Sequence, residues 1–89
     1  MISDKEKILI TKLAKKYNVS KLYLFGSTIQ KGKDTKDIDL AVDGIDDSIF
    51  HKFYSELILN LSKPVDLIDL RKKTLFNESV KSDGVLLYG

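Results

Sequence analysis

Residues 21–44, KLYLFGSTIQKGKDTKDIDLAVDG, hold two candidate strands separated by a polar segment. Apolar residues are concentrated from Lys21 to Phe25 and again from Ile38 to Val42, and each run is bounded by glycine or polar residues. Gly26 and Ser27 directly follow the first run, where a short helical turn opening at the serine is predicted. The stretch therefore predicts a strand–turn–strand unit with polar residues at the strand ends.

The flanking sequence supplies helices and further strands for the same sheet. A helix is predicted from about Asp4 to Tyr17, because apolar residues recur there at helical spacing. A longer helix with a regular apolar stripe is predicted between Asp46 and Leu61. The remaining predicted elements are a strand at Val65–Leu70, a short helix from about Thr74 to Ser82 stopped by Gly84, and an edge strand at Val85–Leu87. This order predicts an α/β (α+β) fold: a small mixed β-sheet of three to four strands flanked by helices, in one domain spanning residues 1–89.

The composition narrows the classes of function. The formal net charge is +2, and 14 of the 15 basic residues are lysines, with Arg71 the one arginine. Base-edge recognition favours arginine, so the sequence argues against sequence-specific nucleic-acid binding. There is no cysteine and no apolar run approaching the ~20 residues that span a bilayer. A cytoplasmic protein without a membrane partner is expected, and a homo-oligomer is left open.

Gly26 and Ser27 form a candidate phosphate site. A glycine at the end of a strand allows close approach of a ligand to the backbone. The serine hydroxyl and the backbone amides that follow can donate to phosphate oxygens. The pair alone is also a common turn, so its meaning depends on what else lies near it.

Two pairs of aspartates interrupt otherwise apolar strands. Asp37 and Asp39 alternate with apolar residues, so they are expected on one face of their strand with α-carbons ~6.6 Å apart. In the later strand Asp66 and Asp69 lie on opposite faces. Spacing alone does not decide which of the latter two joins the first pair. Crowded carboxylates repel each other, and a divalent ion with oxygen ligands, such as magnesium, relieves that repulsion.

The motifs together resemble a known family. Gly26–Ser27, nine intervening residues and then Asp37–Ile38–Asp39–Leu40 are similar to the GS…DxD signature of the DNA polymerase beta-like nucleotidyltransferase superfamily. The strand around Asp66 resembles that family's third-carboxylate strand, and Gly84–Tyr88 resembles the end of its minimal nucleotidyltransferase (MNT) branch. The resemblance spans nearly the whole chain.

The resemblance implies a reaction and a set of site residues. Gly26 and Ser27 would hold the triphosphate of ATP or another NTP. Asp37, Asp39 and Asp66 would bind two magnesium ions, with Asp66 helping to activate the acceptor hydroxyl and Asp69 as the less favoured third carboxylate. The reaction would transfer a nucleoside monophosphate, AMP above all, to a hydroxyl acceptor and release pyrophosphate. Minimal members often pair with an all-helical HEPN-domain protein as a toxin–antitoxin system.

A second interpretation is a non-catalytic antitoxin, or a nucleotide-binding subunit, that neutralises its partner by binding it. Two departures from the family pattern bear on this choice. Lys36 stands where a serine usually precedes the first aspartate, and Lys31 is nearest to a usual loop arginine. A lysine can meet a phosphate only as a point charge, without the bidentate contact of arginine. These changes leave the predicted metal ligands in place.

Overall fold

The computed structural model describes residues 2–29 and 36–89, with only the backbone described at residues 27 and 28. The elements follow the predicted order to within one or two residues at each end. They are α1 (Asp4–Lys16), β1 (Lys21–Leu24), a 3-10 helix η1 (Gly26–Ile29), β2 (Ile38–Asp43), α2 (Asp47–Asn60), β3 (Val65–Asp69), α3 (Leu75–Asp83) and β4 (Val85–Tyr88).

The four strands form one mixed sheet in the order β3-β2-β1-β4. β1 pairs with β2 and with β4 in antiparallel fashion, whereas β2 and β3 are parallel. α2 is the crossover that returns the chain from β2 to a parallel neighbour, as parallel pairing requires. The mixed sheet expected from the sequence is confirmed, with four strands and with the C-terminal segment as an edge strand.

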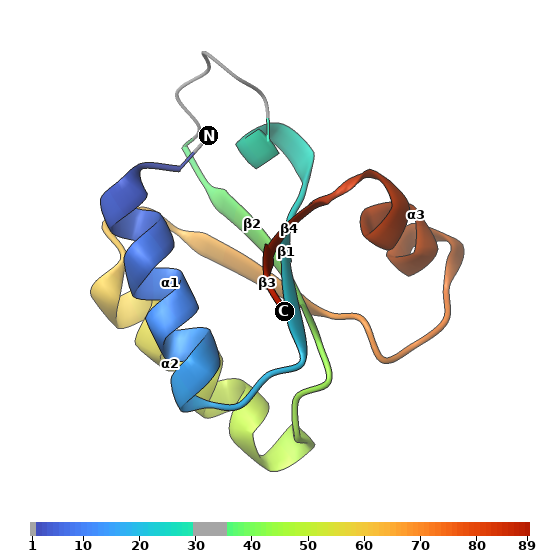
Figure 1. Cartoon of the computed structure of the whole chain (residues 1–89), viewed down its shortest axis with the longest axis horizontal. Helices are drawn as coiled ribbons and strands as arrows, with labels where there is room; N and C mark the ends of the chain where they lie inside the picture. Colours follow the sequence, from blue (N-terminus) through green and yellow to red (C-terminus); the bar gives the residue numbers. More distant parts are fainter. Residues whose placement is uncertain (1, 30–35) are drawn as a thin grey trace.

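The helices cover the two faces of the sheet unequally. α1 and α2 pack together on one face, and the shorter α3 lies on the other (Figure 1). Along β2, Ile38, Leu40 and Val42 are fully buried in the core beneath α1 and α2. Ala41 points the opposite way and joins a smaller cluster with Val80 of α3. Alternation along the strand thus gives β2 one face in the main core and one face toward α3.

Local signals in the sequence explain where the helices begin and end. Ser3 and Glu6 form the expected capping box, with backbone-to-side-chain hydrogen bonds of 3.0 and 3.2 Å. Asn18, at φ 56°, takes the left-handed conformation expected after α1. Asp46 caps α2 by accepting a hydrogen bond from the Ser48 amide.

Gly84 ends α3 as expected, but lack of space, not a left-handed backbone, explains the glycine. Its φ is −70°, a value open to any residue. A β-carbon there would lie 2.5 Å from the carbonyl oxygen of Val80 and 2.9 Å from that of Leu24. The missing side chain therefore lets the chain pass directly from α3 into β4. No helix in the described part of the chain is long and apolar enough to cross a membrane.

Candidate active site

Asp39 of β2 and Asp66 of β3 are direct neighbours in the sheet. They are register partners in the parallel pair, so their side chains leave the same face. The next partners on that face, Ala41 and Ile68, belong to the cluster under α3. Both carboxylates therefore lie on the same face of the sheet as α3. They lie next to the apolar cluster that α3 covers, not within it.

Asp69 lies on the opposite face and is engaged by an arginine. Its carboxylate accepts hydrogen bonds from the Arg71 backbone amide at 3.0 Å and from Arg71 Nε at 2.8 Å. Arg71 also pairs with Asp47 in the first turn of α2. Asp69 thus helps to tie the end of β3 to the start of α2. Of the two aspartates that spacing left open, the structure brings Asp66 to Asp39 and keeps Asp69 away.

Asp37 immediately precedes β2 and is exposed, so it stands at the entrance of the strand that carries Asp39. Asp39 itself is partly buried. Burial raises the pKa of Asp39 above the usual range, and the negative charges of Asp66 and Asp37 raise it further. The negative charges of Asp66 and Asp37 therefore act on Asp39 and disfavour its ionised form.

Gly26 lies against the carboxylate of Asp39. It begins η1 in a left-handed conformation, with φ 64°. A β-carbon on Gly26 would be 2.7 Å from Asp39 Oδ2, well inside van der Waals contact. The backbone amide of the preceding residue, Phe25, donates to the Asp39 carbonyl oxygen at 3.2 Å. The turn after β1 and the acidic end of β2 are thus held together, and a side chain at Gly26 would displace the carboxylate.

Some predicted contacts fall outside the described residues. Ser27 is the second residue of η1, but its hydroxyl lies outside the described part of the chain, as does Lys31. Lys36 is described and exposed, one residue before Asp37.

The donor set suits a divalent cation, although the carboxylates are not gathered around one point. Among residues 2–29 and 36–89, no three acidic or histidine side chains are already arranged to hold a metal ion. The electrostatic coupling at Asp39 nevertheless involves three carboxylates. Crowded carboxylates repel one another without a cation, and a bound divalent ion with oxygen ligands relieves that repulsion. Oxygen ligands beside a glycine turn fit a hard ion such as magnesium.

A pocket of about 470 Å³ borders Gly26 on its other side. Its walls come from the β1–η1 junction and from α3, and they include Phe25, Ile29, Phe76 and Val80. No role was predicted for Phe76 from the sequence, although Leu75 and Phe76 are two exposed apolar residues in succession at the start of a short helix. Gly26 lines this pocket and also lies against Asp39, so the pocket adjoins the group of carboxylates Asp37, Asp39 and Asp66, here called the acidic cluster.

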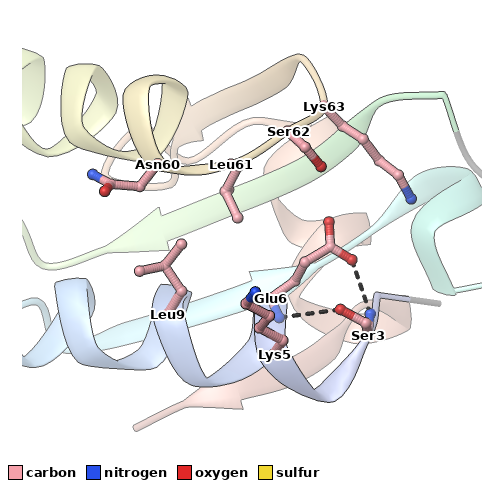
Figure 2. Close-up of a pocket in the computed structure, with 8 residues that line it drawn as sticks. All are labelled: Ser3, Lys5, Glu6, Leu9, Asn60, Leu61, Ser62 and Lys63. Atoms are coloured by element: carbon pink, nitrogen blue, oxygen red, sulfur yellow. Dashed lines mark hydrogen bonds between the residues drawn. The ribbon is translucent and has the colours of Figure 1, made fainter.

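A smaller pocket, of about 330 Å³, lies on the other side of the sheet, between the start of α1 and the end of α2 (Figure 2). Its polar floor is the Ser3–Glu6 capping box. The hydrogen bond from the Ser3 amide lowers the pKa of Glu6, and the positive charge of Lys63 acts in the same direction. These hydrogen bonds cap the N-terminus of α1, and no predicted site residue in the described part of the chain lines this pocket.

Comparisons with known proteins agree with the fold. The family model described as Polymerase beta, Nucleotidyltransferase matches residues 7–89. A toxin–antitoxin crystal structure with AMP-PNP is 30% identical, covers 98% of this chain and 74% of its own, and has a TM-score of 0.74.

Two further solved structures have the same fold. The complex of a tri-AMPylated HEPN toxin with its MNT antitoxin from Shewanella oneidensis is 28% identical over 99% of this chain and 73% of that one, with a TM-score of 0.75. The MntA–HepT toxin–antitoxin structure is 27% identical over 98% of this chain and 73% of that one, with a TM-score of 0.72. A search of curated proteins found no match. The match to the family model over residues 7–89 shows that this chain belongs to the polymerase beta nucleotidyltransferase family.

Proposed function

We propose that this protein is a cytoplasmic, metal-dependent nucleotidyltransferase that transfers AMP from ATP to a hydroxyl group of a HEPN-type partner, as the antitoxin of a toxin–antitoxin pair. The observation that carries the proposal is the pairing of Asp39 with Asp66 beside Gly26. It sets two acidic oxygen donors next to a turn where a ligand can approach the backbone.

The positions of Asp37, Asp39 and Asp66 suggest a different role for each carboxylate. Asp39, partly buried between Gly26 and Asp66, would be the central ligand of two magnesium ions, with Asp37 and Asp66 on either side of it. Bound ions would neutralise charge on the triphosphate and on the pyrophosphate that leaves. Gly26 and Ser27 would direct the turn toward the phosphates.

Asp66 is exposed on β3, farther across the sheet from Gly26 than Asp39 is. It would accept the proton of the incoming hydroxyl. The hydroxyl oxygen forms a bond to the α-phosphorus, and the bond between that phosphorus and the pyrophosphate oxygen breaks.

The choice of acceptor rests on the solved relatives. The Shewanella oneidensis complex contains a HEPN toxin that carries AMP groups, together with its MNT antitoxin. The similarity to that structure extends over 99% of this chain. A HEPN-type protein therefore supplies the acceptor hydroxyl in our proposal, and ATP the AMP group.

Calorimetric titration with ATP, with and without magnesium, tests the site. Wild-type protein is expected to bind ATP in the presence of magnesium, and the Asp37→Asn, Asp39→Asn double variant to lose that binding. Asp69→Asn is the matched control, because it removes a carboxylate from the same sheet on the opposite face. Equal binding by the double variant would overturn the proposed site. Absence of binding by wild type would favour the purely neutralising antitoxin.

A further inference from the structure

The pocket beside Gly26 is open, largely apolar and built from two aromatic rings. Its volume of about 470 Å³ lies in the range of roughly 300–1,000 Å³ typical of small-molecule sites. Phe25 and Phe76 meet edge to face with centroids 6.0 Å apart. Phe76 nevertheless remains 57% exposed, so most of its surface is available to a ligand. An exposed aromatic ring beside a pocket is a platform on which a flat ring can stack.

The order of the strands places this pocket on one side of the acidic cluster. The sheet runs β3-β2-β1-β4, so Asp66 lies on the β3 side and Asp39 in the middle. Phe25 follows β1 and Gly84 precedes β4, and both line the pocket. The acceptor hydroxyl belongs beside Asp66 in the proposed reaction. The pocket therefore lies on the side away from the acceptor, next to the turn proposed to meet the triphosphate.

The polar end of the pocket is formed by the last turn of α3. Ser79 Oγ donates to Asp83 Oδ2 at 3.3 Å, and both residues line the pocket. Asp83 is the last residue of α3, where a negative charge is unfavourable because it meets the negative end of the helix dipole. An ionised carboxylate can only accept hydrogen bonds. It suits a ligand edge that presents an amino group.

From these observations we propose that the pocket between η1 and α3 binds the nucleobase, with Phe76 stacking on the ring and Asp83 accepting from an exocyclic amino group. This inference rests on the proposed function, since it assigns the base of the same nucleotide whose phosphates would meet Gly26. It selects an amino-bearing base such as adenine over uracil, whose ring carries carbonyl oxygens in place of an amino group.

Stacking is tested by comparing two ligands on two variants. Phe76→Ala is expected to weaken magnesium-ATP binding about tenfold and to leave the binding of magnesium tripolyphosphate, which has no base, unchanged. Leu75→Ala is the matched control, because Leu75 is 92% exposed and does not line the pocket. It should change neither affinity. Circular dichroism would verify that α3 persists in both variants.

The outcomes separate the two proposals. Binding of neither ATP nor tripolyphosphate by wild type would contradict the proposed function itself. Binding of both ligands with Phe76→Ala matching wild type would overturn the base pocket alone. Normal ATP affinity with slower AMP transfer in Phe76→Ala would assign the pocket to the acceptor and would also overturn the inference.

The polar end is tested by nucleotide preference. Wild type is expected to prefer ATP to UTP, and Asp83→Asn to reduce that preference several-fold by weakening ATP binding. Removing the charge should not unfold α3, because it also removes an unfavourable interaction with the helix dipole. An unchanged ratio of the two affinities in Asp83→Asn would contradict the role of this carboxylate.

Discussion

Gly26 has no room for a side chain because the Asp39 carboxylate occupies the space: a β-carbon there would be 2.7 Å from Oδ2. The glycine also holds a left-handed backbone, with φ 64°. Two separate requirements, space and conformation, therefore meet at the residue that joins the turn after β1 to the acidic end of β2. This contact makes the turn and the carboxylates one unit.

Gly26→Ala should damage the site more than it damages the fold. We expect a loss of about 1–2 kcal/mol in the free energy of unfolding from the left-handed backbone, measured by urea denaturation. We also expect loss of magnesium-dependent ATP binding, because the new methyl group displaces the Asp39 carboxylate.

Gly44→Ala provides the control for backbone strain. Gly44 has φ 74°, and a β-carbon there would collide with the Ser20 side chain just beyond the far end of β2. Its unfolding free energy should fall by a similar or larger amount while ATP binding in the folded protein persists. Equal loss of binding in both variants would show that strain, and not contact with Asp39, explains the effect.

Asp66→Asn and Asp69→Asn should have opposite consequences. Asp66→Asn is expected to abolish AMP transfer with little effect on stability. Asp69→Asn is expected to retain transfer and to lose about 0–1 kcal/mol of stability, since its bonds to Arg71 are partly exposed. Transfer assays and urea denaturation of both variants test this. Retained transfer in Asp66→Asn would remove it from the mechanism.

The choice between those two aspartates shows what the sequence could and could not predict. Alternation with apolar residues correctly placed Ile38 in the core and Asp39 outside it. It also predicted that Asp66 and Asp69 lie on opposite faces. It could not show which face matches that of Asp39, because that depends on the register between two strands joined through α2. The parallel register Asp39↔Asp66 supplies the missing information.

The pocket lined by Phe25 and Phe76 could not be predicted from the sequence, for a related reason. Phe25 reads as the last residue of a strand, and Phe76 as one of two apolar residues in a short helix. Their contact depends on where α3 packs across the sheet, which no local spacing determines. The helix starts were predictable, by contrast, because Ser3 and Glu6 interact within a single turn.

The pH dependence of Asp39 offers a further test. Burial first, and then the charges of Asp66 and Asp37, raise its pKa above that of an ordinary aspartate. The Asp39 carboxyl of the folded protein therefore binds its proton more tightly than the same carboxyl of the unfolded chain. As a result, the free energy of unfolding should decrease as the pH rises from the ordinary aspartate pKa to the raised pKa of folded Asp39. Binding of a divalent ion requires the ionised form and should weaken as the pH falls through the same window.

Carboxyl NMR titration measures this directly. The Asp39 resonance should titrate above the usual aspartate range in wild type, and Asp66→Asn should shift its pKa downward by removing a neighbouring charge. Asp69→Asn should leave it unchanged. A wild-type Asp39 that titrates in the ordinary range would contradict the electrostatic description of the site.

Asn77 of α3 is expected to stabilise the wall of the pocket, because its side chain holds α3 to the loop that precedes the helix. Its buried side chain donates to the carbonyl oxygens of Lys72 at 2.7 Å and Asp69 at 3.3 Å. Asn77→Ala is expected to cost about 1–3 kcal/mol in urea denaturation, because these carbonyls lose a buried donor. Asn60→Ala, which removes an exposed side-chain bond to the Glu56 carbonyl, should change stability by less than about 0.5 kcal/mol.

The most direct test of the central claim is transfer of label from α-³²P-ATP to a HEPN-type partner, with wild type and Asp39→Asn compared in the same assay. We predict that wild type labels the partner in the presence of magnesium and neutralises its toxicity, whereas the variant does neither. Neutralisation by the variant, with no label on the partner in either reaction, would contradict the account and identify an antitoxin that acts by binding alone.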